Sequence, residues 1–288
     1  MVIREGRDAM TSAAAVIIAW FLVIVLEVLA GRFLEKENTK LRDVVIEVFS
    51  TANVFFLSVP LVILAGASLA AYLFPGQADA LIGLPFWAMF LLFAIGDDMT
   101  QYWWHRASHS FPLLYNLHRV HHDADYLNVR ITYRNGILYY LPMPSLWITG
   151  LLVYLGGGEV YAFYVVLKSI VIIGAHSSVH WDEPLYKIKW LNPVMWVVER
   201  TISTPATHSA HHGRHKSDGV THYKGNFSNL FFLWDMIFGT AKITRRYPDA
   251  YGVENLNEVS GAQLLLWPLV GAGKGSVERK TPPVQPAE

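Results

Sequence analysis

The sequence predicts an all-α fold: a multi-span helical membrane protein with a helical lobe on the cytoplasmic side. Hydrophobic residues make up 53% of the 288 residues, and charged residues make up only 16%, against roughly 25% in an average soluble domain. Between residues 48 and 96 the only charged side chain is that of Asp79, and residues 136–158 contain none. Apolar runs of this length are typical of membrane-spanning helices.

The composition excludes several classes of protein. A disordered chain has many charges and few apolar residues, and a net charge of zero provides no basic surface for nucleic acid. The chain has no cysteine, which excludes disulfides, Cys-ligated zinc and Cys-ligated iron–sulfur clusters. The unusual residue is histidine, because all 12 copies lie between His105 and His222.

Five apolar segments are expected to cross the membrane. In chain order they are approximately residues 13–29, 52–74, 82–96, 137–155 and 160–175. The first is not interpreted as a cleavable signal, because acidic residues flank it and no small-residue cleavage site follows. The helix of the third is expected to continue beyond the membrane through Trp104, and the glycines at 156–158 form a turn between the last two segments.

The charges of the connections predict the orientation. The connection after the first segment and the segment 105–136 each contain four Lys or Arg residues, whereas the connections at 75–81 and 156–158 contain none. Because Lys and Arg in short connections favour the cytoplasmic side, we expect residues 32–51, 105–136 and everything after 175 to face the cytoplasm. All 12 histidines would then lie on that side.

Ten of the histidines form four clusters. They are His105 and His109; His118, His121 and His122; His176 and His180; and His208, His211 and His212. Residues three and four apart share a helix face, so each cluster offers two or three imidazoles to one point. Neutral imidazole is a ligand for zinc, copper, iron and nickel. A single ion takes about four to six ligands, so ten imidazoles predict two metal ions.

The spacing of the histidines narrows the choice of metal. The chain contains neither HExxH, which zinc proteases use, nor ExxH, which carboxylate-bridged di-iron bundles use. A structural zinc site is complete with four ligands. An all-imidazole pair with open positions fits redox-active iron and O2. A membrane zinc-dependent hydrolase and a metal transporter remain as alternatives.

The motifs as a set resemble the integral-membrane fatty acid hydroxylase and sterol desaturase superfamily, over approximately residues 82–252. They are Asp98, Tyr102, Trp103, His105, Arg106 and His109, then HRVHH at 118–122, HSSVH at 176–180, TPATHSAHHG at 204–213 and LWDMIFGT at 233–240. The chain departs from the usual pattern at Asp123, where relatives often have Ser, and after Arg134, where Asn135 and Gly136 replace an R-x-H-P stretch.

The resemblance implies a non-haem di-iron oxygenase with two iron ions (Fe2+/Fe3+) held by the ten clustered histidines. It would hydroxylate or desaturate a lipid or sterol substrate from the bilayer, using O2. The sequence has no dinucleotide-binding motif and no segment for a cytochrome, so we expect a separate electron donor: a reductase, a ferredoxin or a cytochrome. The regions expected are an N-terminal membrane hairpin (1–81), a fatty acid hydroxylase-like catalytic domain (82–261), and an interfacial segment with a disordered tail (262–288).

Several residues beside the clusters are assigned provisional roles. Asp98 is the candidate catalytic residue, because it precedes His105 by two helical turns and is expected to hold the second nitrogen of a ligand. Asp97 is expected to be its solvated neighbour. Lys168 lies within a predicted span, where snorkelling, a protein partner and a functional role stay open. His215 is expected to be outer-sphere or solvated, with an additional ligand or a proton donor as the alternatives. His222 is expected not to be a ligand, and the resemblance implies that Asn226 lies near the site.

Overall fold

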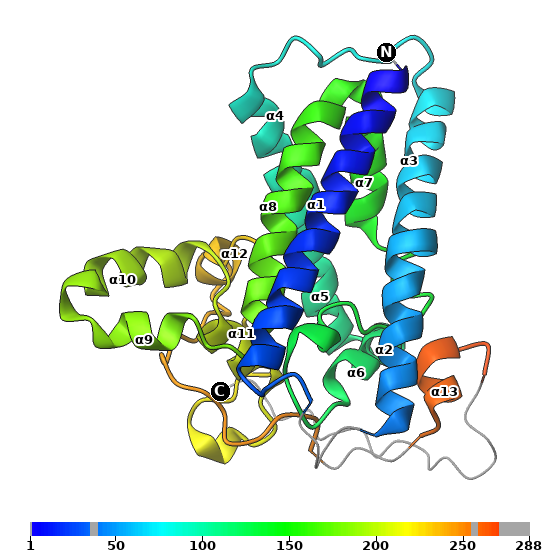
Figure 1. The fold of residues 1–288 in the computed structure, drawn as a ribbon. Helices are drawn as coiled ribbons and strands as arrows, with labels where there is room; N and C mark the ends of the chain where they lie inside the picture. Colours follow the sequence, from blue (N-terminus) through cyan, green and yellow to red (C-terminus); the bar gives the residue numbers. More distant parts are fainter. Residues whose placement is uncertain (1, 35–39, 255–258, 271–288) are drawn as a thin grey trace.

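The computed structural model describes residues 2–34, 40–254 and 259–270, with residues 2–13 as backbone only. Throughout these residues the regular structure is helical, and the β pairing is limited to an isolated bridge between Gly213 and Tyr251. The predicted all-α fold is therefore confirmed. A bundle of long helices stands above a group of short helices and loops (Figure 1).

The long helices follow one another in the first two thirds of the chain. They are α1 (Val2–Leu29); α2 (Leu41–Asn53), a π-helical turn (Val54–Ser58) and α3 (Val59–Leu73); α4 (Phe86–Phe93), a π-helical turn (Ala94–Met99) and α5 (Thr100–Ser110); α7 (Pro144–Leu152) with a π-helical turn (Val153–Gly157); and α8 (Gly158–His176). The short helices are α6 (Pro112–His122), α9 (Asp182–Lys187), α10 (Asn192–Thr201), α11 (Pro205–His212), α12 (Leu233–Ile237) and α13 (Gly261–Leu266).

Two helical stretches, residues 41–73 and 144–176, are long and apolar enough to cross a membrane. The second stretch reverses at Gly156, whose φ of 105° is accessible to glycine, so α7 and α8 are two helices joined by the predicted turn. The fourth predicted segment begins later than expected: residues 137–143 form turns, and α7 starts at Pro144. Proline lacks the N–H that a helix interior needs but is favourable in the first turn.

The long helices pack in two pairs, α1 on α8 and α3 on α7. Glycines allow the backbones of α3 and α7 to approach closely. A Cβ added to Gly150 would lie 2.4 Å from the carbonyl oxygen of Ile63, and one added to Gly66 would lie 2.8 Å from the carbonyl oxygen of Trp147. In a membrane, helix packing excludes no water, and small residues at the contacts commonly allow two helices to approach closely.

The histidine-bearing helices meet at the end of the bundle opposite the connection after α3 and the turn before α8 (Figure 1). The structure thus places the histidine clusters at one end of the bundle, as predicted. The segment predicted to be interfacial contains helix α13. Helix α13 packs against α2 and α6, and Leu264 and Leu265 are buried beside Ile46 and Val120. The predicted tail, 271–288, lies outside the described residues.

We predict that Gly150→Ala lowers the thermal unfolding midpoint of the protein in nanodiscs by several degrees, because the new methyl group overlaps the backbone of α3. Overpacking of this kind costs about 1–3 kcal/mol. The matched control is Gly83→Ala, since a Cβ at Gly83 meets no atom within 4 Å. Equal midpoints for the two variants would contradict this account of the α3–α7 contact.

Candidate metal centre

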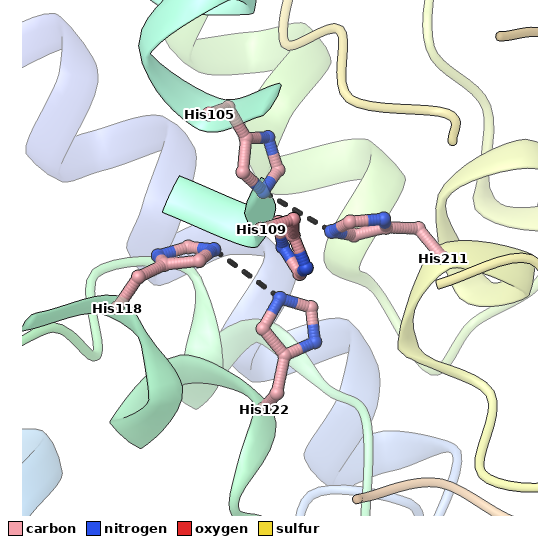
Figure 2. Close-up of side chains that lie close together, drawn as sticks. All are labelled: His105, His109, His118, His122 and His211. Carbon is pink, nitrogen blue, oxygen red and sulfur yellow. Dashed lines mark hydrogen bonds between the residues drawn. The ribbon is translucent and has the colours of Figure 1, made fainter. Parts of the chain in front are cut away.

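Nine histidines converge in two adjacent groups at the lower end of the bundle. The ligand nitrogens within each group lie within 4.8 Å of one another. The first group is His105, His109, His118, His122 and His211, and the second is His121, His176, His208 and His212. All are buried except His109, which is partly buried. Figure 2 shows the first group, whose rings come from three helices and point to a common centre.

The helical register divides the two HxxHH triplets between the groups. On α6, His118 and His122 are four residues apart and enter the first group, while His121 enters the second. On α11 the division is reversed, because His208 and His212 enter the second group and the intervening His211 enters the first. Each triplet therefore contributes to both groups, so the expectation that its three imidazoles point to one place was wrong.

Four of the imidazoles are anchored through Nδ1. His105 donates to the carbonyl oxygen of Phe227 at 2.7 Å, and His211 donates to that of Gly225 at 2.8 Å. Likewise His176 donates to the carbonyl oxygen of Ile172 at 2.8 Å, and His118 contacts Oδ1 of Asn135 at 2.9 Å. These acceptors carry no proton, so the network assigns the proton to Nδ1. In a neutral ring, Nε2 then carries no proton and has an available lone pair.

The lone pairs face one another at short range. Nε2 of His105 lies 3.1 Å from Nε2 of His211 in the first group (Figure 2). In the second group, Nε2 of His176 lies 2.9 Å from Nε2 of His208 and 3.3 Å from Nε2 of His121. Two imidazole nitrogens about 2.1 Å from one ion lie approximately 3 Å apart when they occupy adjacent positions. The donor set therefore fits a metal ion in each group.

One further nitrogen supports this fit. Within the described residues, Nε2 of His109 is buried and has no hydrogen-bond partner. A buried nitrogen without a partner loses the free energy of hydration. A bound metal ion would restore a partner to such a nitrogen.

Burial keeps the imidazoles neutral, which is the state that binds metal. It lowers the pKa of His105 to about 4. Burial also lowers the pKa of the remaining histidines of α5, α6 and α11 well below its ordinary value. These are His109, His118, His121, His122, His208, His211 and His212. Neighbouring imidazoles contribute to the lowering, because each would repel a second positive charge.

The loop that supplies the carbonyl anchors is itself fixed by buried side chains. Asn226, at φ 55°, donates to the carbonyl oxygens of Thr207 and Lys242 and accepts from the backbone N–H of Lys242. Asp235 accepts the backbone N–H groups of Phe227 and Ser228 at 2.9 and 2.7 Å. Asn226 thus lies near the site as expected. The role of Asp235 was not predicted, although this residue lies within the LWDMIFGT motif at 233–240.

The two departures from the usual family pattern also support the first group. Asn135 holds His118, and its side-chain N–H donates to the hydroxyl of Tyr140. The preceding Arg134 is fully buried and lies 2.9 Å from Asp43 of α2. Asp123, directly after α6, pairs with Arg42 of α2 at 3.0 Å. These contacts fasten the end of α6 to α2.

Asp98 lies elsewhere than expected. Its carboxylate accepts the backbone N–H groups of Leu230 and Phe231 and the indole N–H of Trp234, and among the described residues no hydrogen bond joins it to a histidine. It therefore positions the loop that leads to the carbonyl anchors. The expectation of a solvated Asp97 was wrong, because Asp97 is buried and pairs with Lys168. The π-helical turn at 94–99 changes the helical register on which both expectations depended.

Three histidines lie outside the two groups. Helix α8 ends at His176 and Ser177 is extended, so His180 does not follow His176 on one helix face. The ring of His180 stacks on Tyr247 with centroids 3.6 Å apart. His215 is exposed beside Glu254, and His222 contacts the carbonyl oxygen of Thr240.

A cavity of about 1290 Å³ runs from the histidines into the bundle. Five histidines from both groups line it: His105, His118, His121, His176 and His208. The rest of its wall comes mainly from apolar side chains of α3, α4, α7 and α8, including Ile63 and Val165. A long apolar compartment thus opens directly onto both candidate metal sites.

Comparisons with known proteins agree with this geometry. The family model described as fatty acid hydroxylase matches residues 90–240. Similar proteins include alkylglycerol monooxygenases from Danio rerio (26% identical, 63% of this chain and 37% of the relative) and Xenopus tropicalis (24%, 77% and 45%). A methylsterol monooxygenase from Aspergillus fumigatus is 26% identical, over 53% of this chain and 46% of the relative. The chain thus spans less than half the length of these relatives. No solved structure matches.

We predict that the metal-free protein loses stability as the pH falls from 7 to 5. The unfolded histidines take up protons near their ordinary pKa of 6.5, whereas buried His105 does so only near 4. The unfolded state therefore binds more protons in this range, and His105 alone would cost about 2 kcal/mol at pH 5. Thermal unfolding at several pH values checks this. A midpoint that is constant or rises towards pH 5 would contradict it.

We also predict that Asn135→Leu weakens metal binding about tenfold, because loss of the acceptor for Nδ1 of His118 frees that ring to rotate and changes its tautomer. Asn135→Asp retains an acceptor oxygen and should bind more tightly than Asn135→Leu. Metal titration of the purified variants provides the comparison. Wild-type affinity in Asn135→Leu would show that the contact does not orient the ligand.

Proposed function

The chain belongs to the fatty acid hydroxylase family, whose model matches more than half of its residues, and on this premise we propose that it is a membrane-bound, non-haem di-iron oxygenase. It hydroxylates or desaturates a lipid or sterol, using O2 and electrons supplied from outside. The names of its relatives support this class of reaction, since they include alkylglycerol and methylsterol monooxygenases.

One observation carries the proposal. The unprotonated Nε2 atoms of His105 and His211 face each other 3.1 Å apart in the first group, and that of His176 lies 2.9 Å from Nε2 of His208 in the second. We propose all nine grouped histidines as iron ligands. His180 is omitted, because its ring stacks on Tyr247 away from both groups.

The chain's own residues supply the setting for the reaction. The iron ions, when bound, activate O2 for attack on a C–H bond. The cavity delivers hydrocarbon to the face of both groups, because five of the ligands form part of its wall. The carbonyl oxygens of Gly225 and Phe227 hold His211 and His105 in place, and Asp98 acts as a positioning residue through the adjoining loop.

We propose that the chain crosses the membrane several times, with its histidine groups on the cytoplasmic side. Apolar side chains are widely exposed on the bundle, as at Phe21 (60%), Phe56 (79%) and Tyr72 (82%), which fits contact with lipid. The excess of Lys and Arg at the histidine end of the bundle supports the orientation. A separate electron donor would then reach the metal sites from the cytoplasm.

The decisive experiment is lipid profiling of an expression host under 18O2, with and without the protein. We predict one lipid that gains a single 18O atom or loses two hydrogens only when the protein is present. His211→Ala should abolish this product and lower the iron content, because it removes a ligand whose Nε2 directly faces His105.

The matched control is His215→Ala, because the His215 side chain is 42% exposed and lies outside both groups, and this variant should keep the product and the iron. Full activity in His211→Ala would contradict the ligand assignment. Turnover supported by zinc in the absence of O2 would overturn the oxygenase proposal in favour of a membrane hydrolase.

A further inference from the structure

The ion pair between Asp97 and Lys168 lies in the wall of the cavity, and the proposed function does not use it. Nζ of Lys168 contacts Oδ2 of Asp97 and lies 3.8 Å from Oδ1 of Asp98. The hydroxyl of Tyr164 donates to the same Oδ2 at 2.7 Å. Both charged side chains are almost completely buried, and burial of charge within a membrane bundle costs free energy. The position of the ion pair beside the cavity suggests a role in binding a ligand.

Both members of the ion pair lie the same number of residues before a histidine of the candidate metal centre. Asp97 precedes the cavity-lining His105 by eight residues, and Lys168 precedes His176 by the same number. Eight helical residues rise by about 12 Å. Gln101 lies midway between Asp97 and His105 and also lines the cavity. A polar stripe therefore leads from the histidines to the ion pair along an otherwise largely apolar wall.

Two amide groups on this wall have unused hydrogen-bonding capacity. Within the described residues, the side chains of Gln101 and Asn229 make no hydrogen bond to the protein, and both line the cavity. The backbone N–H of Leu230, next to Asn229, donates to Asp98, which brings Asn229 close to the ion pair in the chain fold. Both side chains are partly buried, and an amide group that lines the cavity can donate to and accept from a ligand bound there.

The charges of this region select the kind of partner. Asp97, Asp98 and Lys168 carry a formal net charge of −1, so a carboxylate or phosphate would be repelled. A hydroxyl group both donates and accepts, and it therefore matches the amide groups and a carboxylate. The apolar wall around them accommodates hydrocarbon.

We propose that Gln101, Asn229 and the Asp97–Lys168 pair form a subsite that binds a hydroxyl group of a neutral lipid, and thereby sets which carbon lies beside the histidines. The inference rests on the proposed function, because it takes the cavity to be the substrate site. It is a claim about binding, however, and can be tested without turnover.

The test measures equilibrium binding of radiolabelled hexadecan-1-ol, hexadecane and palmitate to the full-length, metal-loaded protein in nanodiscs, corrected for uptake by empty nanodiscs. The wild-type protein should prefer the alcohol to both other probes. Gln101→Leu should weaken alcohol binding by about fivefold and leave hexadecane binding unchanged, because it removes one neutral hydrogen bond at similar volume.

Two other variants complete the design. Asp97→Asn combined with Lys168→Met removes both charges together and should also reduce the preference for the alcohol. Gln77→Leu is the matched control, because Gln77 is exposed and lies outside the cavity wall, and it should keep that preference. If the charge variant does not fold, Gln101→Leu and Asn229→Leu decide the outcome.

Two results would overturn the subsite. The first is that Gln101→Leu and Asn229→Leu both keep the wild-type ratio of alcohol to alkane affinity. The second is that the wild-type protein binds palmitate more tightly than the alcohol. The two proposals fail separately. If the protein prefers the alcohol but oxidises no lipid, the subsite is supported and the oxygenase proposal is contradicted. If the protein oxidises a lipid but shows no preference for the alcohol, the oxygenase proposal is supported and the subsite is contradicted.

Discussion

The structure depends on one constraint: buried neutral imidazoles cannot face one another through their lone pairs without a cation between them. The carbonyl anchors force this arrangement at His105, His176 and His211, since Nδ1 donates in each. Protonation would relieve the repulsion, but burial lowers the pKa of these rings, to about 4 for His105. Metal binding is the remaining way to satisfy nitrogens held approximately 3 Å apart.

This constraint explains why so much of the polar structure lies behind the histidines. Asp235 and Asn226 fix the loop whose carbonyl oxygens hold His105 and His211, and Asp98 fixes the adjoining part of that loop. On the other side, the buried Arg134 fastens the segment of Asn135 to α2. The helices bring ligands to one end of the bundle, and these contacts set the orientation of each ring. In the proposed function, the cavity would give an apolar substrate access to the same point.

The sequence was sufficient to predict the helical fold and the common end of the bundle at which the histidine clusters lie. It was also sufficient to predict the candidate ligands on α5, α6 and α11, because HxxxH and HxxHH spacings determine which side chains share a helix face. It was insufficient where the helix was not regular. The π-helical turn at 94–99 moves Asp97 into the cavity wall, and the end of α8 at His176 separates His180 from its expected partner. The backbone anchors at Gly225 and Phe227 left no signal in residue type, since any residue supplies a carbonyl oxygen.

The central claim is that each histidine group holds one metal ion. The most direct measurement is the metal content of the purified chain after anaerobic loading with Fe2+, by mass spectrometry of the digested protein. We expect two iron ions per chain, with both lost on chelation and restored on reloading. A stoichiometry of one or none in a folded protein would contradict it.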